Sequence, residues 1–206
     1  IPIYVAANGP RALRTAGVYG DGLCSVFNEQ IPVLTYNLEQ VRKGAQMANR
    51  ELINYQTTTL TNAVILRAGE KLTDDAIVEK AGSWAVTALH FVYEIWRYTK
   101  EDSVVPEYMR SIWEEYCDHV DNFPLPKEKA HQLIHEGHCS FYTDGEKKFV
   151  TPEMIEGTTL VGSAAEIAEK ISEAGKHGLS EVSLLPPLHN IREAAKEFAE
   201  EVIPLC

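Results

Sequence analysis

The stretch IYVAANGPR, residues 3–11, joins an apolar run to a turn and then to the start of a helix. Residues 1–7 predict a buried strand. Pro10 is suited to the first position of a helix that runs to about Val18, because the N–H group that proline lacks has no partner there anyway. A strand followed directly by a helix is the repeating unit of α/β proteins. The turn between them, AANG, therefore lies where a parallel sheet would place a ligand.

Three more apolar runs follow this first one. They cover residues 22–27, 58–67 and 181–185. Each run is short and continuous, and the segments between the runs have the 3.6-residue periodicity of helices. Such strands, buried on both faces and alternating with helices, predict a parallel sheet in the α/β class.

The helical segments carry recognisable start and stop signals. Asn37 is a plausible N-cap for an apolar stripe that continues to Leu52. Ser163 and Glu166 predict a capping box at the start of a helix, and Gly178 is expected to end that helix. The stretch 139–150 predicts a hairpin or loop with Asp-Gly as its turn. Further helices are predicted at residues 74–97, 106–120 and 127–136, and a short helix is predicted to start at Pro152. In the last predicted helix, near the end of the chain, the residues expected to face inward are Ile191, Ala195, Phe198 and Val202.

Four βα units make half of an eight-stranded barrel. A half-barrel alone would expose two strand edges, which proteins normally avoid. We therefore expect either that the other half was lost or lies on another chain, or that the sheet is open and doubly wound, and we favour the first. The start at Ile1 suggests a fragment, a processed product or an incompletely described chain. The helical block 74–136 is expected to be an insertion within one domain, residues 1–206.

Composition narrows the class of function. The net charge of −11 argues against a nucleic-acid binder, which would carry a basic stripe. No basic tract or long apolar run favours a membrane as partner. The four cysteines show no C-x-x-C spacing, so we expect free thiols and a cytoplasmic protein.

The turn after the first strand has the residues of a ligand site. Ala6 and Ala7 leave room for a flat ring, and Asn8 and Gly9 tolerate unusual φ angles that let successive N–H groups converge. The helix N-terminus favours an anion, and Arg11 adds positive charge. The residues alone leave open a second interpretation, in which this is a tight turn that binds nothing.

The motifs around this turn resemble one known family. The segment YVAANGPRALRTAGVYGDGL and the later motifs HEGH, FVTPEMI and LVGSAAEI are similar, in this order, to the luciferase-like monooxygenase superfamily. The resemblance is closest to its branch that uses the deazaflavin coenzyme F420. These motifs reach from Ile3 to about Pro204, which is essentially the whole chain.

The resemblance implies a (β/α)8 TIM barrel of which this chain supplies about strands five to eight, with residues 74–136 as the family's insertion. It implies coenzyme F420, or alternatively FMN, packed against Ala6, Ala7, Asn8 and Gly9, with Arg11 as a weaker candidate. The catalytic residues remain unknown, because the family takes most of them from the N-terminal half of the barrel. The family frequently forms dimers, and the aromatic side chains of residues 84–96 are candidates for that contact.

Three functions follow as hypotheses. The first is an oxidoreductase that transfers hydride between F420 and a small organic substrate. The second is an FMN-dependent monooxygenase. The third is a non-catalytic fragment or partner subunit that completes a barrel.

A metal site is not expected. His131, His135 and His138 have the i, i+4, i+7 spacing of one helix face, but Gly137 should end the helix between the last two. Surface or core histidines are the simpler interpretation, and the family resemblance supplies no metal.

Overall fold

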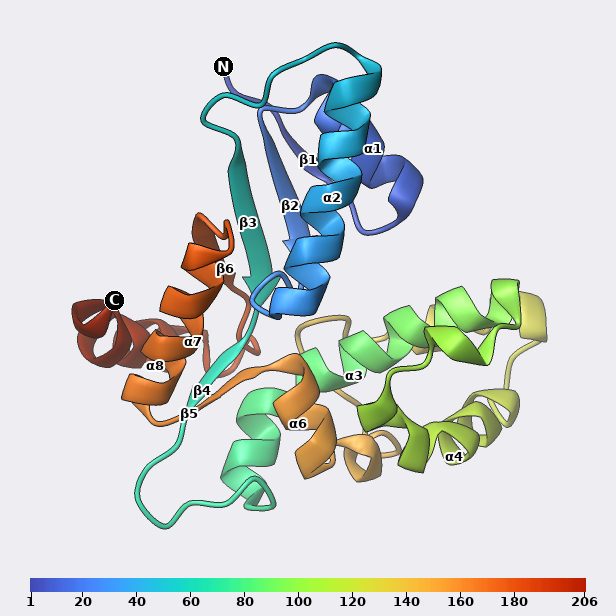
Figure 1. Cartoon of the computed structure of the whole chain (residues 1–206). Helices are drawn as coiled ribbons and strands as arrows, with labels where there is room; N and C mark the ends of the chain where they lie inside the picture. Colours follow the sequence, from blue (N-terminus) through green and yellow to red (C-terminus); the bar gives the residue numbers. More distant parts are fainter. The chain divides into compact units, whose positions relative to one another are not determined.

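The four predicted strands form one parallel sheet in the computed structural model, which describes all 206 residues. They are β1 (Tyr4–Ala6), β2 (Gly22–Val26), β3 (Gln56–Thr61) and β6 (Glu181–Leu184), hydrogen-bonded in the order β1-β2-β3-β6 (Figure 1). All three neighbouring pairs are parallel. The predicted α/β class with a parallel sheet is confirmed, but the sheet is open and this chain forms no closed barrel.

The chain divides into two compact units. The first, called the sheet unit below, contains the four-stranded sheet and comprises residues 1–61, 162–184 and 197–206. Its helices are α1 (Pro10–Tyr19), α2 (Ile31–Met47) and α7 (Ala164–Lys176), followed near the C-terminus by the short turns η5 (Phe198–Val202) and η6 (Ile203–Leu205).

The helices of the sheet unit pack on one face of its sheet. Leu23 of β2 lies in a buried cluster with residues of α1 and α2, and Val182 of β6 packs on a second cluster formed by α2, α7 and Leu179. The register places Leu23 beside Thr57, and Val182 beside Thr59, so both side chains point the same way. The opposite row contains the exposed residues Ala6 and Glu181. Within this unit the sheet therefore has one covered face, as in the wall of a barrel, whereas a doubly wound sheet carries helices on both faces.

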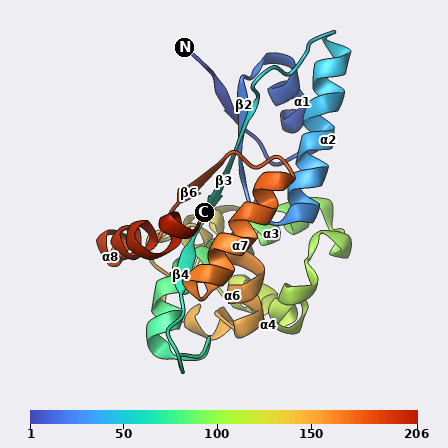
Figure 2. The same ribbon diagram turned by 60° about the vertical axis from the view of Figure 1, so that its left-hand side comes forward.

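The second unit, called the helical unit, comprises residues 62–161 and 185–196. The short strands β4 (Ala63–Ile65) and β5 (Leu160–Gly162), which belong to this unit except for Gly162, pair with each other. Its helices appear in both views (Figure 2). They are α3 (Asp75–Thr99), α4 (Arg110–Asp121), α5 (His131–Ile134), α6 (Pro152–Thr158) and α8 (Ile191–Glu197), with the 3-10 turns η1 (Asp102–Val104), η2 (Glu107–Met109), η3 (Lys127–Lys129) and η4 (Lys147–Phe149).

Aromatic side chains hold the helical unit together. Tyr93 of α3 lies 5.6 Å from Tyr116 and 6.2 Å from Trp113 of α4, measured between ring centroids. The indole nitrogen of Trp84 donates to the carbonyl of Thr158 at 2.7 Å, which ties α3 to α6. Such ring pairs and a satisfied indole N–H are typical of a core. None of the helices is both long enough and apolar enough to cross a membrane.

Several predicted elements match, and the capping box is one of them. The Ser163 hydroxyl accepts from the Glu166 N–H, and the Glu166 carboxylate accepts from the Ser163 N–H at 2.8 Å. Helix α7 ends one residue before His177, and Gly178 follows with a φ of 109°, the left-handed conformation that glycine adopts without strain.

Other predicted elements are wrong in detail. The run 58–67 is not one strand, because Asn62 breaks it: its side chain accepts from the Ala63 N–H and donates to the Lys80 carbonyl. The stretch 139–150 is a loop with no hairpin strands. In the last predicted helix Val202 is buried as predicted and Phe198 is half-buried, but Ile191 is 42% exposed and Ala195 is also exposed, so the predicted inner face is wrong for these two residues. The segment is also not one regular helix, because a π turn begins at Phe198.

Candidate cofactor site at the strand ends

The turn after β1 lies where the carboxyl ends of the parallel strands meet. The Ala7 N–H continues the ladder by donating to the Cys24 carbonyl at 3.1 Å. Ala7 is buried, at 4% exposure, whereas Ala6, Asn8, Gly9 and Arg11 are exposed. The predicted site residues therefore form one continuous turn, with one small side chain inside and the others at the surface.

Gly9 is not required by the backbone. Its φ of −91° and ψ of 156° are extended values open to any residue, and neither Asn8 nor Gly9 has a positive φ. The prediction of unusual φ angles at these positions is therefore wrong: the turn connects strand to helix through ordinary extended geometry. A Cβ atom at Gly9 would meet no atom of the chain within 4 Å. Gly9 therefore leaves open space beside the backbone at the N-cap of α1.

The start of α1 is suited to an anion. Gly9 is its N-cap and makes no side-chain cap, Pro10 lies in the first turn, and no acidic residue lies there. The Leu13 N–H donates to the Gly9 carbonyl at 2.9 Å, so the N–H groups of Arg11 and Ala12 precede the first intrahelical bond. These N–H groups and the Arg11 guanidinium offer positive potential with no carboxylate in competition.

Asn8 is anchored through one half of its side chain. Its Oδ1 accepts from the Ser25 hydroxyl at 2.6 Å and from the Val26 N–H at 3.2 Å, both at the end of β2. The Nδ2 group is then the part of the amide that remains to donate to a ligand. The turn after β1 is held to the neighbouring strand end by a side chain rather than by the backbone ladder alone.

A buried chain of amides extends this anchor into α2. Asn37 donates to the Ser25 hydroxyl at 3.3 Å and to Oδ1 of Asn28 at 2.8 Å, and Asn28 donates to the Thr58 carbonyl at 2.9 Å. Asn37 was predicted as an N-cap, which is wrong: α2 begins at Ile31, and Asn37 is a buried residue inside it. Because each buried amide has partners, the network fixes the ends of β1, β2 and β3 relative to α2.

Glu29 is the titratable group of this region that sequence reasoning missed. It follows β2 and is buried, and its two carboxylate oxygens accept from the hydroxyls of Thr59 (2.5 Å) and Thr61 (2.9 Å) of β3. Burial raises the pKa of Glu29, and these hydrogen bonds oppose the rise only in part. No sequence signal marks Glu29, because its partners lie about thirty residues away and are brought to it by strand pairing alone.

Glu29→Gln is expected to change how stability depends on pH. A carboxyl with a raised pKa binds its proton more tightly in the folded state, so its contribution to stability is present at low pH and decreases as the pH rises through the folded pKa. The native chain should therefore lose more stability than the variant as the pH rises from about 4.5 to neutrality. Urea unfolding across that range measures the difference; equal slopes for both proteins would contradict the assignment.

The comparisons with known proteins bear on the family and the fold of the chain. A model of the luciferase-like monooxygenase family matches residues 1–181. No curated protein matches the sequence.

Two solved structures are similar to the chain. The coenzyme F420-dependent tetrahydromethanopterin reductase from Methanopyrus kandleri superimposes with a TM-score of 0.55 at 21% identity, over 99% of this chain and 50% of that one. An F420-dependent secondary alcohol dehydrogenase in complex with an F420-acetone adduct gives a TM-score of 0.51 at 18% identity, over 100% of this chain and 49% of that one. The chain thus spans about half the length of these structures, which show its fold. Since the family model matches well over half of the sequence, the chain belongs to the luciferase-like monooxygenase family.

Proposed function

We propose that the chain is the C-terminal half of a TIM-barrel oxidoreductase that transfers hydride between coenzyme F420 and a small organic substrate. In this arrangement β1, β2, β3 and β6 are strands five to eight of the barrel, and residues 74–136 form an insertion. Family membership supports oxidoreductase chemistry, and the two structural neighbours that carry F420 in their names favour the deazaflavin. The observation that carries the proposal is the open space at Gly9 beside an acid-free helix start.

Each part of the turn would have a different role in binding such a coenzyme. Ala6 and Gly9 leave space beside the backbone, and Asn8, held by Ser25, presents its amide at the strand ends. The first N–H groups of α1 and the side chain of Arg11 would hold an anionic tail. The coenzyme itself supplies the hydride chemistry, while the protein binds it, orients it and excludes water. The other half of the barrel would supply the acid–base residues.

An FMN-dependent monooxygenase is the second candidate, because the matched family is described as a monooxygenase and the resemblance implies FMN as the alternative cofactor. The two candidates differ in the cofactor that copurifies with the protein as the cell produces it. Oxidised flavin shows paired visible bands, whereas the deazaflavin shows one band at shorter wavelength. If the copurified cofactor has a flavin spectrum, FMN and not F420 is the cofactor of this protein.

A non-catalytic partner subunit is the third candidate, since the chain spans about half of each matched structure. In that case the protein would bind another polypeptide but neither cofactor. We propose a homodimer for the enzyme; of the aromatic residues considered for its contact, Phe91 is exposed, whereas Trp84 and Tyr93 are buried. The four cysteines are free, which is typical of the reducing cytoplasm, where we place the protein.

Gly9→Val tests the cofactor site directly. A Cβ atom at Gly9 would meet no atom of the chain within 4 Å, so a valine side chain would extend into the space that the chain leaves open. The affinity for F420 is expected to fall roughly tenfold or more, because overpacking a site costs about 1–3 kcal/mol. Titration of the protein as the cell produces it, followed by cofactor fluorescence, measures the change.

Gly175→Val is the matched control, because Gly175 in α7 also has no atom within 4 Å of an added Cβ. The control should bind F420 like the native protein, and both variants should keep the native melting temperature within a few degrees. An unchanged affinity in Gly9→Val would remove the turn from the cofactor site.

A further inference from the structure

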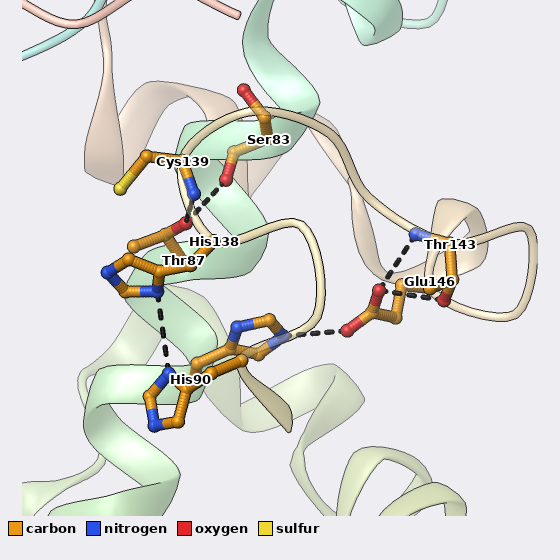
Figure 3. A network of polar contacts seen from close by, with 8 residues as sticks. Ser83, Thr87, His90, His138, Cys139, Thr143 and Glu146 are labelled. Atoms are coloured by element: carbon orange, nitrogen blue, oxygen red, sulfur yellow. Dashed lines mark hydrogen bonds and ion pairs between the residues drawn. The ribbon is translucent and has the colours of Figure 1, made fainter. Parts of the chain in front are cut away.

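Three histidines meet in the helical unit. His90 is a buried residue of α3, at 1% exposure, and His135 and His138 follow the short helix α5 and are exposed. One ring nitrogen of each lies within 4.8 Å of the other two. Figure 3 shows His90 and His138 together with Glu146 and Thr143. His131, the third histidine of the spacing noted in the sequence, instead contacts the carbonyl of Glu128.

Glu146 fixes the orientation of His90. Oε1 of this buried carboxylate lies 2.6 Å from Nε2 of His90, and its Oε2 accepts from the Thr143 N–H (2.9 Å) and hydroxyl (2.7 Å). Because the other oxygen of this carboxyl group already accepts two hydrogen bonds, we assign Glu146 as the acceptor and Nε2 of His90 as the donor.

Nδ1 of His90 is left as a buried atom without a hydrogen-bond partner. With the proton on Nε2, neutral His90 has its lone pair on Nδ1. A buried polar atom of this kind costs about 1–3 kcal/mol unless a group from outside the protein satisfies it. A carboxylate that holds one imidazole nitrogen while the other stays free is the arrangement in which proteins present histidine to a metal ion.

The two exposed histidines provide the other ligands. Nδ1 of His135 lies 3.4 Å from Nδ1 of His138. That separation equals the edge of a tetrahedron with zinc–nitrogen bonds of about 2.0–2.1 Å. Three nitrogens within 4.8 Å of one another fit inside a circle of about 2.8 Å radius, so an ion at its centre requires each nitrogen to move by no more than about 0.7 Å.

We propose that His90, His135 and His138 bind one divalent transition-metal ion, with Zn²⁺ as the preferred ion and Glu146 as the residue that orients His90. Three imidazole nitrogens without a carboxylate ligand favour Zn²⁺, Co²⁺ or Ni²⁺ over Mg²⁺ and Ca²⁺. The exposure of two ligands leaves the fourth position to water or a small ligand. The ion would join the loop at residues 135–138 to α3 and stabilise the helical unit by mass action.

The test uses the full chain without an affinity tag, after removal of metals by a chelator. Calorimetric titration with Zn²⁺ should give one ion per chain with micromolar or tighter affinity, and Co²⁺ should give the visible absorption of a tetrahedral nitrogen site. His135→Gln and His138→Gln should each weaken Zn²⁺ binding at least about tenfold, and Glu146→Gln roughly ten- to hundredfold. Zn²⁺ should raise the melting temperature of the native chain and not that of the His138→Gln variant.

His131→Gln is the matched control, because His131 is an exposed histidine of the same segment that lies outside the cluster. It should bind Zn²⁺ like the native chain. The variants His135→Gln and His138→Gln should fold normally, because both histidines are exposed. They therefore test the proposal even if Glu146→Gln does not fold. Absence of one-to-one Zn²⁺ binding, or an equal loss in His131→Gln and His138→Gln, would overturn the proposal.

Discussion

Glu146→Ala is expected to lower the free energy of unfolding by about 3 kcal/mol, because each buried group that loses its hydrogen-bond partner costs about 1–3 kcal/mol. The substitution leaves the Nε2–H of His90 without an acceptor in a site where His90 is 1% and Glu146 is 2% exposed. It also removes the acceptor of the Thr143 N–H and hydroxyl, which hold the loop before η4. Three donors lose their acceptor at once, and the two on Thr143 are partly buried.

Urea unfolding in the presence of a chelator measures this loss separately from any metal effect. Glu156→Ala is the matched control, an exposed glutamate of the same unit whose removal should change stability by no more than about 0.5 kcal/mol. The loss of stability in Glu146→Gln should lie between the losses in Glu146→Ala and Glu156→Ala, because the glutamine amide oxygen can still accept a hydrogen bond. A loss below about 1 kcal/mol in Glu146→Ala would mean that water replaces the carboxylate and that the cluster is open to solvent.

The sheet could be predicted from the sequence because its signals are local. Short apolar runs at residues 22–27 and 181–185 became β2 and β6, and the Pro10 start of α1 appeared at the predicted residue. The family motifs also follow one another along the chain. The location of the AANG turn at the strand ends then followed from chain direction alone.

The interior of the site could not be predicted, because its contacts join residues far apart in sequence. Asparagine is a common N-cap residue, so the sequence predicts that role for Asn37. Only the fold shows that its side-chain amide donates to Ser25 and Asn28. The same holds for the histidine cluster: His90 lies 45 residues before His135, and the nearer His131 has the better sequence spacing. Periodicity identifies which face of a helix is apolar, but it does not identify which distant polar groups meet there.

Gly17→Ala is expected to destabilise the sheet unit by about 3 kcal/mol, at the upper end for overpacking. A Cβ atom at Gly17 of α1 would lie 1.9 Å from the Val41 carbonyl oxygen of α2, and one at Gly44 of α2 would lie 2.0 Å from the Arg14 carbonyl oxygen of α1. Both obstacles are backbone atoms, which no side-chain rotation can move. The two helices can accommodate the methyl group only by separating.

Gly175→Ala is also a glycine-to-alanine substitution, but it is expected to raise the stability of the sheet unit. Gly175 lies inside α7 with no atom near an added Cβ, so alanine should raise stability by about 0.4–1 kcal/mol through its better helix propensity and the smaller entropy of the unfolded chain. Thermal and urea unfolding of both variants measure the contrast. A neutral Gly17→Ala would show that α1 and α2 separate at little cost. Since α1 begins at the turn that holds Gly9 and Arg11, the separation forced by Gly17→Ala should also displace that turn from Ser25, and cofactor affinity should fall with stability in this variant but not in Gly175→Ala.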